Sequence, residues 1–316
     1  MAEESKGPVV AALGANFAIA VGKIVAGVLT GSAALLAEAG HSIADTVNQV
    51  FLLIGINRSD TTPDEKHPMG YGKEAFFWSF LAAIFIFVAG AAFSFYEGTR
   101  TLIQDEDHAR TGGQLLIGFG VLGFAIVFES ISWAVAVRGL RAGARAKKWS
   151  LGKYIRESPD ITLKTVLFED SAALVGLVLA GGGLGLSELT GNEDWDGIAS
   201  LLIGVVLAAV AFLLGAQSRK LLLGSAASDE TQQHIRETLA SFPEVVHIVR
   251  VLTIQLGSHS VLVTGELNVK RDMNTDAIED LLVRIDTELE RRVPEVADTF
   301  WELKRTGAVP KRAGGH

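Results

Sequence analysis

A histidine and an aspartate, His41 and Asp45, stand four residues apart inside the apolar segment 31–56. In an α-helix this spacing places both side chains on one face, about 6 Å apart along the axis. An imidazole and a carboxylate so placed can both bind a divalent cation. Ionisable groups inside a membrane helix cost at least ~2.5 kcal/mol each, and they mark ion or proton pathways. The pair therefore predicts a metal site at bilayer depth.

The polar positions extend beyond this pair. Glu38 and Asn48 fall on the same stripe of the predicted helix, and a second apolar segment, 161–185, carries Glu169 and Asp170. Two acid-bearing segments predict a divalent cation held between two helices. The chain contains no cysteine, so the ligands must come from histidine, carboxylates, asparagine, the backbone or water.

The composition is that of a membrane protein with a soluble part. Of the 316 residues, 49% are hydrophobic, and the mean hydropathy is +0.33. Each predicted span is long enough to cross ~30 Å of hydrocarbon. The first ten residues lack the basic region and cleavage site of a secretory signal, so we expect the first span to be retained. The six predicted spans are residues 8–30, 32–56, 74–98, 114–137, 161–185 and 196–217.

Loop charges predict the orientation. The connection after the fifth span is acidic and carries no base, whereas the connection after the fourth is strongly basic. Lysine and arginine accumulate on the cytoplasmic side, which places both termini in the cytoplasm of a bacterial inner or plasma membrane. The net charge of −8 gives no indication of a nucleic-acid partner. The basic residues are Arg138, Arg141, Arg145, Lys147, Lys148, Lys153 and Arg156.

The sequence changes character after the last span. Apolar periodicity predicts helices at 230–241 and 275–292, and alternation predicts strands at 245–255 and 260–269. A further strand is expected at 298–304. The order α-β-β-α-β indicates a small two-layer α+β domain. We therefore predict a six-helix membrane domain over 1–226, a soluble domain over 227–306 and a disordered tail over 307–316.

Several motifs together resemble the cation diffusion facilitator family, solute carrier family 30. Their order and spacing carry the resemblance over nearly the whole chain, and the segments 157–160 and 169–176 are most similar to the zinc transporter nine branch. The motifs are Lys23-x-x-Ala26-Gly27, Thr30-Gly31-Ser32, Glu38-Ala-Gly-His41-Ser42-x-x-Asp45, His67-Pro68-x-Gly70-x-Gly72-Lys73-Glu74, Asp170, and Asp196 with Ser200.

The resemblance implies six transmembrane helices, a cytoplasmic ferredoxin-like domain and a homodimer that exports Zn²⁺ or a related ion against protons. It implies a secondary transporter working by alternating access, with no enzymatic step and no cofactor. The family's tetrahedral site takes two ligands from the second helix and two from the fifth. His41, Asp45 and Asp170 match three of these positions, while Val166 occupies the fourth.

The fourth ligand stays open at this point. Glu169 is rotated about 100° from Asp170 on a helix, so it is either a reoriented ligand or a structural residue. The structural alternative is a hydrogen bond between helices or an ion pair with Lys23. Water or Glu129 could also complete the site. Glu38, Glu129 and Lys23 are candidates for a proton or ion pathway, although Lys23 is expected first to link helices.

Other polar residues fit structural roles. Tyr71 stands where some relatives have a further histidine, so we expect the loop with Asp64 and His67 to be structural. Asp160 is expected to cap the fifth span. The soluble domain lacks the histidines of metal-sensing relatives, which predicts dimerisation without a binuclear site. Its own histidines are His234, His247 and His259.

Ligand chemistry narrows the metal. One imidazole with two or three carboxylates suits Zn²⁺, and it would also accept Mn²⁺, Fe²⁺ or Co²⁺. Binding needs a neutral imidazole and ionised acids, so protons leave as metal enters, which is the basis of antiport. A transport-inactive scaffold is the main rival. A membrane metal hydrolase is disfavoured because the chain has no H-E-x-x-H motif.

Overall fold

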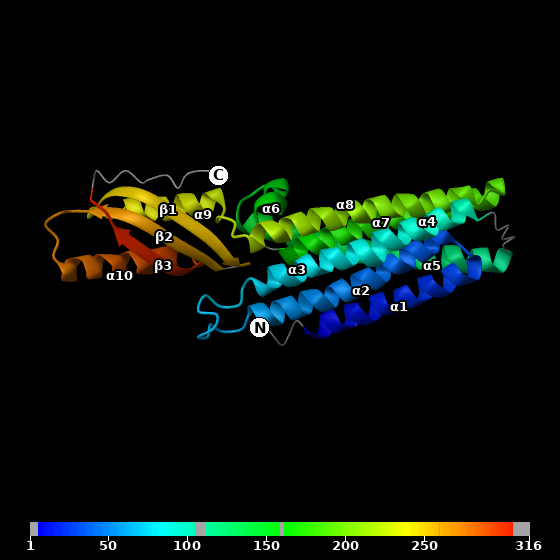
Figure 1. The fold of residues 1–316 in the computed structure, drawn as a ribbon, viewed down its shortest axis with the longest axis horizontal. Helices are drawn as coiled ribbons and strands as arrows, with labels where there is room; N and C mark the ends of the chain where they lie inside the picture. The colour runs from blue at the N-terminus through cyan, green and yellow to red at the C-terminus, as the bar shows by residue number, and fades with distance from the viewer. Residues whose placement is uncertain (1–5, 105–110, 159–160, 259, 306–316) are drawn as a thin grey trace. The chain divides into compact units, whose positions relative to one another are not determined.

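The computed structural model describes residues 6–104, 111–158, 161–258 and 260–305 (Figure 1). The contacts within it define two compact units. The first comprises Met1–Asp60 and Glu74–Arg219, and the second comprises Thr61–Lys73 and Lys220–His316.

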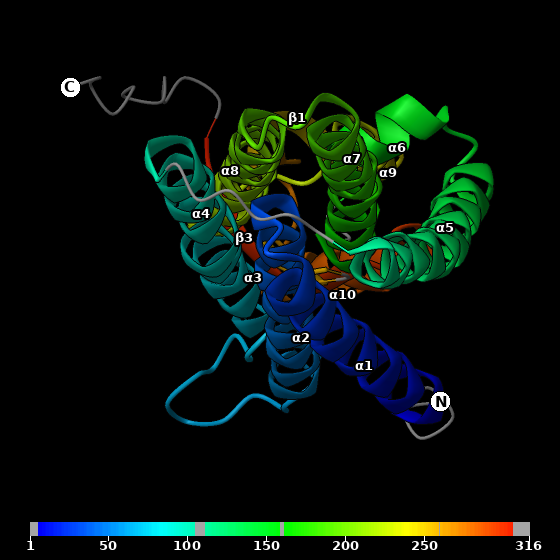
Figure 2. The same ribbon diagram turned by 90° about the vertical axis from the view of Figure 1, so that its right-hand side faces the viewer.

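The first unit is a bundle of long helices. In it, α2 contacts α1, α3, η1, α4 and α7, and α7 also contacts α5; the end-on view in Figure 2 shows this grouping. The segments α3, η1 and α4 follow one another without a break. The elements are α1 (Lys6–Thr30), α2 (Ala33–Ser59), α3 (Glu74–Phe85), the π-helix η1 (Ile86–Ala92), α4 (Phe93–Ile103), α5 (Gly112–Ala146), α6 (Leu151–Glu157), α7 (Ile161–Thr190) and α8 (Asp194–Leu222).

Four helical segments of the described chain are long and apolar enough to cross a membrane: Glu74–Ile103, Gly112–Ala146, Lys164–Thr190 and Asp194–Leu222. The helix α2 does not meet this criterion, and its buried Glu38, His41 and Asp45 lower its hydropathy. The apolar segment Asn16–Thr30 of α1 is shorter than these four. Six spans therefore remain a prediction.

Capping fixes where α2 begins. Gly31 has φ +66°, a left-handed conformation that favours glycine and ends α1. The Ser32 hydroxyl then accepts a hydrogen bond from the Leu35 amide at 3.1 Å. Asp196 at the start of α8 accepts hydrogen bonds from the Ser32 hydroxyl and the Ala33 amide, each at 2.6 Å. The carboxylate thus ties α8 to the positive end of α2.

Two features of the bundle were not anticipated from periodicity. The third predicted span contains the π-helix η1, and α2 approaches it closely at Gly40. A Cβ on Gly40 would lie 3.1 Å from the Ala89 carbonyl oxygen and 2.8 Å from the Phe93 ring. The second feature is α6, a short helix inside the basic connection. Both depend on packing between helices, which a single-segment pattern does not report.

The second unit confirms the predicted α-β-β-α-β order. Its elements are α9 (Asp229–Ala240), β1 (Val245–Gly257), β2 (Ser260–Val269), α10 (Thr275–Arg292) and β3 (Val296–Leu303). The sheet order is β1-β2-β3, with β1 antiparallel and β3 parallel to β2.

One face of this sheet forms the core. Alternate β2 residues Val261, Val263 and Leu267 are fully buried, as alternation predicts. They pack against apolar residues of the two helices, among them Ile235 of α9 and Ile285 of α10. Burial of one sheet face under two helices makes this the expected two-layer α+β unit.

Candidate functional site

The predicted pair on α2 is buried on one face of the helix. His41 is 1% exposed and Asp45 is 9% exposed. The His41 Nε2 atom lies 3.4 Å from Asp45 Oδ2, without forming a hydrogen bond. Both nitrogens of His41, and Oδ1 of Asp45, are buried without a hydrogen-bond partner in the described structure.

Asp170 lies on α7, a helix that contacts α2. Its carboxylate is hydrogen-bonded by the Ser132 hydroxyl of α5, while its Oδ2 atom is buried without a partner among the described residues. Val166 is half-buried and precedes Asp170 by four residues on the same helix. Its alkyl side chain contributes no donor atom.

His41, Asp45 and Asp170 all have buried atoms without a hydrogen-bond partner in the described structure, and these atoms are of the types that bind metals. Buried nitrogen and oxygen atoms are paired in nearly all native structures, because an unmade hydrogen bond costs about 1–3 kcal/mol. An imidazole nitrogen and two carboxylate oxygens are also the donor atoms that Zn²⁺ and related cations bind. The donor set therefore fits a divalent cation.

The three groups are not assembled around one point. Within the described residues, no three His, Asp or Glu side chains are close enough to hold a single ion. The Asp45 carboxylate nevertheless interacts electrostatically with Glu129, Glu169 and Asp170. The arrangement is a set of interacting acids on α2, α5 and α7, with His41 beside one of them, Asp45.

Glu169 has a direct partner on α2, the helix that carries His41 and Asp45. The Asn48 amide nitrogen of α2 donates to its two carboxylate oxygens, at 2.6 and 2.5 Å. This is the hydrogen bond between helices that the sequence left as one alternative for Glu169. The Asn48 Oδ1 atom is buried without a partner in the described structure.

Lys23 is completely buried and pairs with Glu38. Its Nζ atom lies 2.9 Å from Glu38 Oε2 and donates to the Ser42 hydroxyl at 2.7 Å, so α1 is tied to α2 at two points. The ion pair with Glu169 that the sequence left open is not formed. The Glu38 carboxylate also lies against Gly176 of α7. A Cβ at position 176 would collide with this carboxylate.

Glu129 enters the cluster from α5. It is 8% exposed, and its charge interacts with Lys23, Glu38 and Asp45. Ser132, the hydrogen-bond donor to Asp170, is three residues further along α5. Sequence analysis did not single out Ser132. The i, i+3 spacing from Glu129 is the signal that places it on the same face.

The loop with Asp64 and His67 is held by its own hydrogen bonds. Asp64 accepts from the Tyr71 hydroxyl at 2.8 Å and from the His67 and Lys66 amides at 2.7 and 2.9 Å. The Tyr71 bond, followed by the His67 amide, lowers the pKa of the Asp64 carboxyl below its ordinary value. This geometry is that of a turn.

The remaining candidates lie apart from the cluster or outside the described residues. His234 of α9 and His247 of β1 are exposed. Asp160, expected as a helix cap, and His259 fall outside the residues that the structure describes, as does the predicted disordered tail 307–316.

Comparison with known families shows the family to which this chain belongs. A family described as "Cation efflux transmembrane domain" matches residues 9–223, and one described as "Cation efflux protein, cytoplasmic domain" matches residues 227–301. The chain belongs to the cation efflux family. The resemblance to cation diffusion facilitators is thereby confirmed. This family consists of multi-pass membrane transporters of cations and not of enzymes.

Curated members of the cation efflux family include proteins similar to most of this chain. "Proton-coupled zinc antiporter SLC30A9, mitochondrial" of Homo sapiens is 34% identical over 284 residues, 88% of this chain and 49% of the relative. "Metal tolerance protein C4" of Arabidopsis thaliana is 31% identical over 237 residues, 75% of this chain and 51% of the relative. The chain thus spans about half the length of these two relatives.

A shorter relative matches end to end. "Manganese efflux system protein MneP" of Bacillus subtilis (strain 168) is 24% identical over 292 residues, 92% of each chain. The similarity to the zinc transporter nine branch is confirmed by the zinc antiporters, which reach 36% identity in Xenopus laevis. Relatives named for zinc and for manganese both belong to this family.

Proposed function

We propose that this cation efflux protein is a Zn²⁺/H⁺ antiporter that carries the metal out of the cytoplasm by alternating access. One observation carries the proposal. His41, Asp45 and Asp170 present buried, unpaired nitrogen and oxygen atoms on two contacting helices of a membrane unit. The name of the human relative, a proton-coupled zinc antiporter, supports the same reading.

The proposed cycle follows from the donor set. Neutral His41 and the ionised carboxylates of Asp45 and Asp170 bind the ion, and Glu169 or water supplies the fourth ligand. Because these groups are not assembled in this structure, binding requires them to come together, by a change of side-chain conformation or by a shift of α2 against α7. Protons from the discharge side compete for the same atoms and release the metal.

The remaining architecture is proposed with it. We infer six spans, with α1 and α2 added to the four apolar segments, and both termini in the cytoplasm. The basic residues 138–156 follow the fourth span, and the acidic residues Glu188, Glu193 and Asp194 follow the fifth. The C-terminal unit, residues 227–306, is proposed as a ferredoxin-like domain that dimerises. The match to the family's cytoplasmic domain supports this assignment.

Manganese is the second candidate cargo. A site with one imidazole and several carboxylates is harder than a site with two imidazoles, and hard ligands suit Mn²⁺. The relative named for manganese efflux is consistent with that choice. Fe²⁺ and Co²⁺ would fit the same donors.

Flux into proteoliposomes tests the proposal. With acid on the receiving side, uptake of Zn²⁺, Mn²⁺, Fe²⁺ and Co²⁺ is measured for the native protein and for His41→Ala, Asp45→Asn and Asp170→Asn. Each substitution should reduce flux to background. His67→Ala in the exposed loop is the matched control and should keep normal flux. Normal flux in any two site variants would overturn the site, and no flux of any ion would identify a scaffold.

A further inference from the structure

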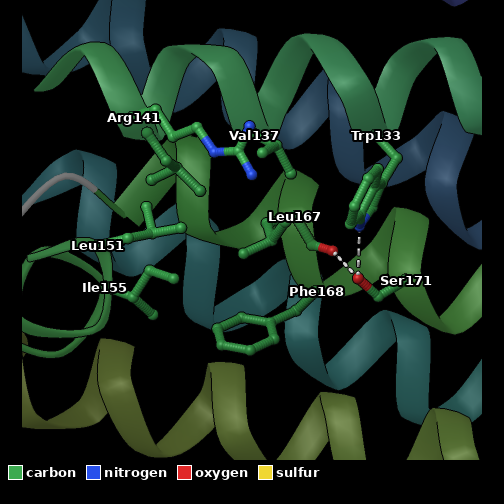
Figure 3. A pocket seen from close by; sticks show the side chains of 9 residues that line it. Trp133, Val137, Arg141, Leu151, Ile155, Leu167, Phe168 and Ser171 are labelled. Carbon is green, nitrogen blue, oxygen red and sulfur yellow. Dashed lines mark hydrogen bonds between the residues drawn. The ribbon is translucent and has the colours of Figure 1, made fainter. Parts of the chain in front are cut away.

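An open apolar pocket lies between α5, α6 and α7 (Figure 3). Its volume is about 310 Å³, at the lower end of the range for small-ligand sites. All three helices contribute apolar side chains: Trp133, Val137 and Leu140 come from α5, Leu151 and Ile155 from α6, and Leu167 and Phe168 from α7. None of these residues is one of the candidate metal-binding residues on α2, α5 and α7.

Arg141 is the one charged side chain among the described residues that line the pocket. Figure 3 shows its side chain running along α5 toward Val137. It is exposed, and no acidic group of the described structure forms an ion pair with it. An apolar pocket with one unpaired guanidinium favours a ligand that combines an apolar part with an anion.

Several basic residues follow Arg141 in the chain, namely Arg145, Lys147 and Lys148. The ammonium groups of Lys147 and Lys153 lie 5.3 and 4.5 Å from the centre of the Trp149 ring, which holds them beside α6. The positive charge is therefore concentrated where α5 meets α6.

The short helix α6 has the pattern of a helix at a membrane surface. Leu151, Tyr154 and Ile155 pack toward Leu140, whereas Arg156 is exposed and Lys153 is half-buried. Such an apolar face beneath a basic one is typical of helices that lie in the lipid interface. Here α6 forms one wall of the pocket.

The position of the pocket along α5 agrees with an interfacial depth. The apolar run of α5 ends at Val137, and Arg138 is its first basic residue. Trp133, one turn earlier, donates from Nε1 to the Ser171 hydroxyl at 3.0 Å. Tryptophan is enriched where hydrocarbon meets headgroups, so the pocket spans that boundary.

We propose that this pocket binds an anionic phospholipid, with an acyl chain against the apolar walls and the phosphate at Arg141. Basic pockets between transmembrane helices bind anionic headgroups, and each arginine or lysine near the surface contributes about 1 kcal/mol. A zwitterionic lipid would bring a choline cation close to Arg141, and the two positive charges repel each other. A free phosphate would leave the apolar walls uncovered. The inference requires a membrane protein and is independent of which metal is carried.

Native mass spectrometry of the purified full chain tests the proposal. Retention of phosphatidylglycerol and phosphatidylcholine with identical acyl chains is compared for the native protein, Arg141→Gln and the control Arg138→Gln. Arg138 is exposed on the same helix but does not line the pocket. The native protein and Arg138→Gln should prefer phosphatidylglycerol. In Arg141→Gln the preference should fall about fivefold, the change that corresponds to one basic contact.

A second variant tests the apolar part. Ile155→Trp fills the pocket from α6 and should reduce retention of both lipids, while size-exclusion chromatography checks that it remains folded. Inorganic phosphate should not displace the bound phosphatidylglycerol. Equal retention of the two lipids by the native protein, an unchanged preference in Arg141→Gln, or displacement by phosphate would each overturn the proposal.

Discussion

Asn48 on α2 donates its side-chain amide to both carboxylate oxygens of Glu169 on α7. The helix that carries His41 and Asp45 is thereby hydrogen-bonded to the helix that carries Asp170. The bond holds the Glu169 carboxylate at the Asn48 side chain. When α2 moves against α7, the hydrogen bond between Asn48 and Glu169 must either break or be kept by a matching movement of the two side chains.

The first prediction concerns Asn48→Ala. Removing the amide frees the Glu169 carboxylate, which can then serve as the fourth ligand of the proposed site. Zn²⁺ should bind about fivefold more tightly, the equivalent of about 1 kcal/mol for a hydrogen bond no longer competing with the metal. Titration calorimetry of the purified protein measures the change. In a Glu169→Gln background the gain should disappear. The same gain in both backgrounds would remove Glu169 from the site.

The second prediction concerns the buried ion pair of Lys23 and Glu38. Lys23→Met leaves an uncompensated carboxylate at a site with 0% exposure and should destabilise the protein by about 3–5 kcal/mol. The double variant Lys23→Met with Glu38→Gln should recover most of that loss, because no unpaired charge remains. Unfolding in detergent, followed by circular dichroism, measures both. Lys73→Met, at an exposed position, is the control. A double variant no more stable than Lys23→Met would show that the loss does not come from an unpaired Glu38 charge.

The sequence predicted the helices and strands closely because each has a clear apolar pattern. The predicted strand 260–269 is observed with the same bounds, and the predicted helix 275–292 is α10. What it did not predict are features set by contacts between segments. Glu169 alone is compatible with several partners, and only the packing of α2 on α7 selects Asn48. The helix α6 is too short for periodicity to reveal within a basic connection.

The candidate metal site likewise combines features that follow from local spacing with features that depend on contacts between helices. The i, i+4 spacing of His41 and Asp45 was sufficient to place both on one buried face, because helix geometry fixes it. The pairing of Lys23 with Glu38 was open in the sequence, since Glu169 was an equally valid partner. The role of Ser132 depends on how α5 lies against α7. Distances across helices are tertiary quantities that a single sequence does not contain.

A third prediction concerns the C-terminal unit. The described histidines of residues 227–305, His234 and His247, are exposed and lie in no group that could hold a metal within the described residues. Hydrogen exchange of residues 229–303, measured in the full-length protein, should therefore be unchanged by micromolar Zn²⁺. Peptides from α2 and α7 in the same experiment should gain protection and serve as the internal control. Strong protection confined to α9 and β1 would assign a sensor site to this unit.

The last prediction concerns Val166, which precedes Asp170 by one turn of α7. If the ion is held between α2 and α7, Val166→His should place an imidazole at the fourth position and give a site of two histidines and two aspartates. A softer nitrogen then replaces an oxygen donor, so selectivity should move toward Zn²⁺ over Mn²⁺ by roughly tenfold. Competition flux in proteoliposomes measures that ratio. Val175→His, at an exposed position of the same helix, is the matched control and should leave the ratio unchanged. An unchanged ratio in Val166→His would place the ion away from this turn of α7.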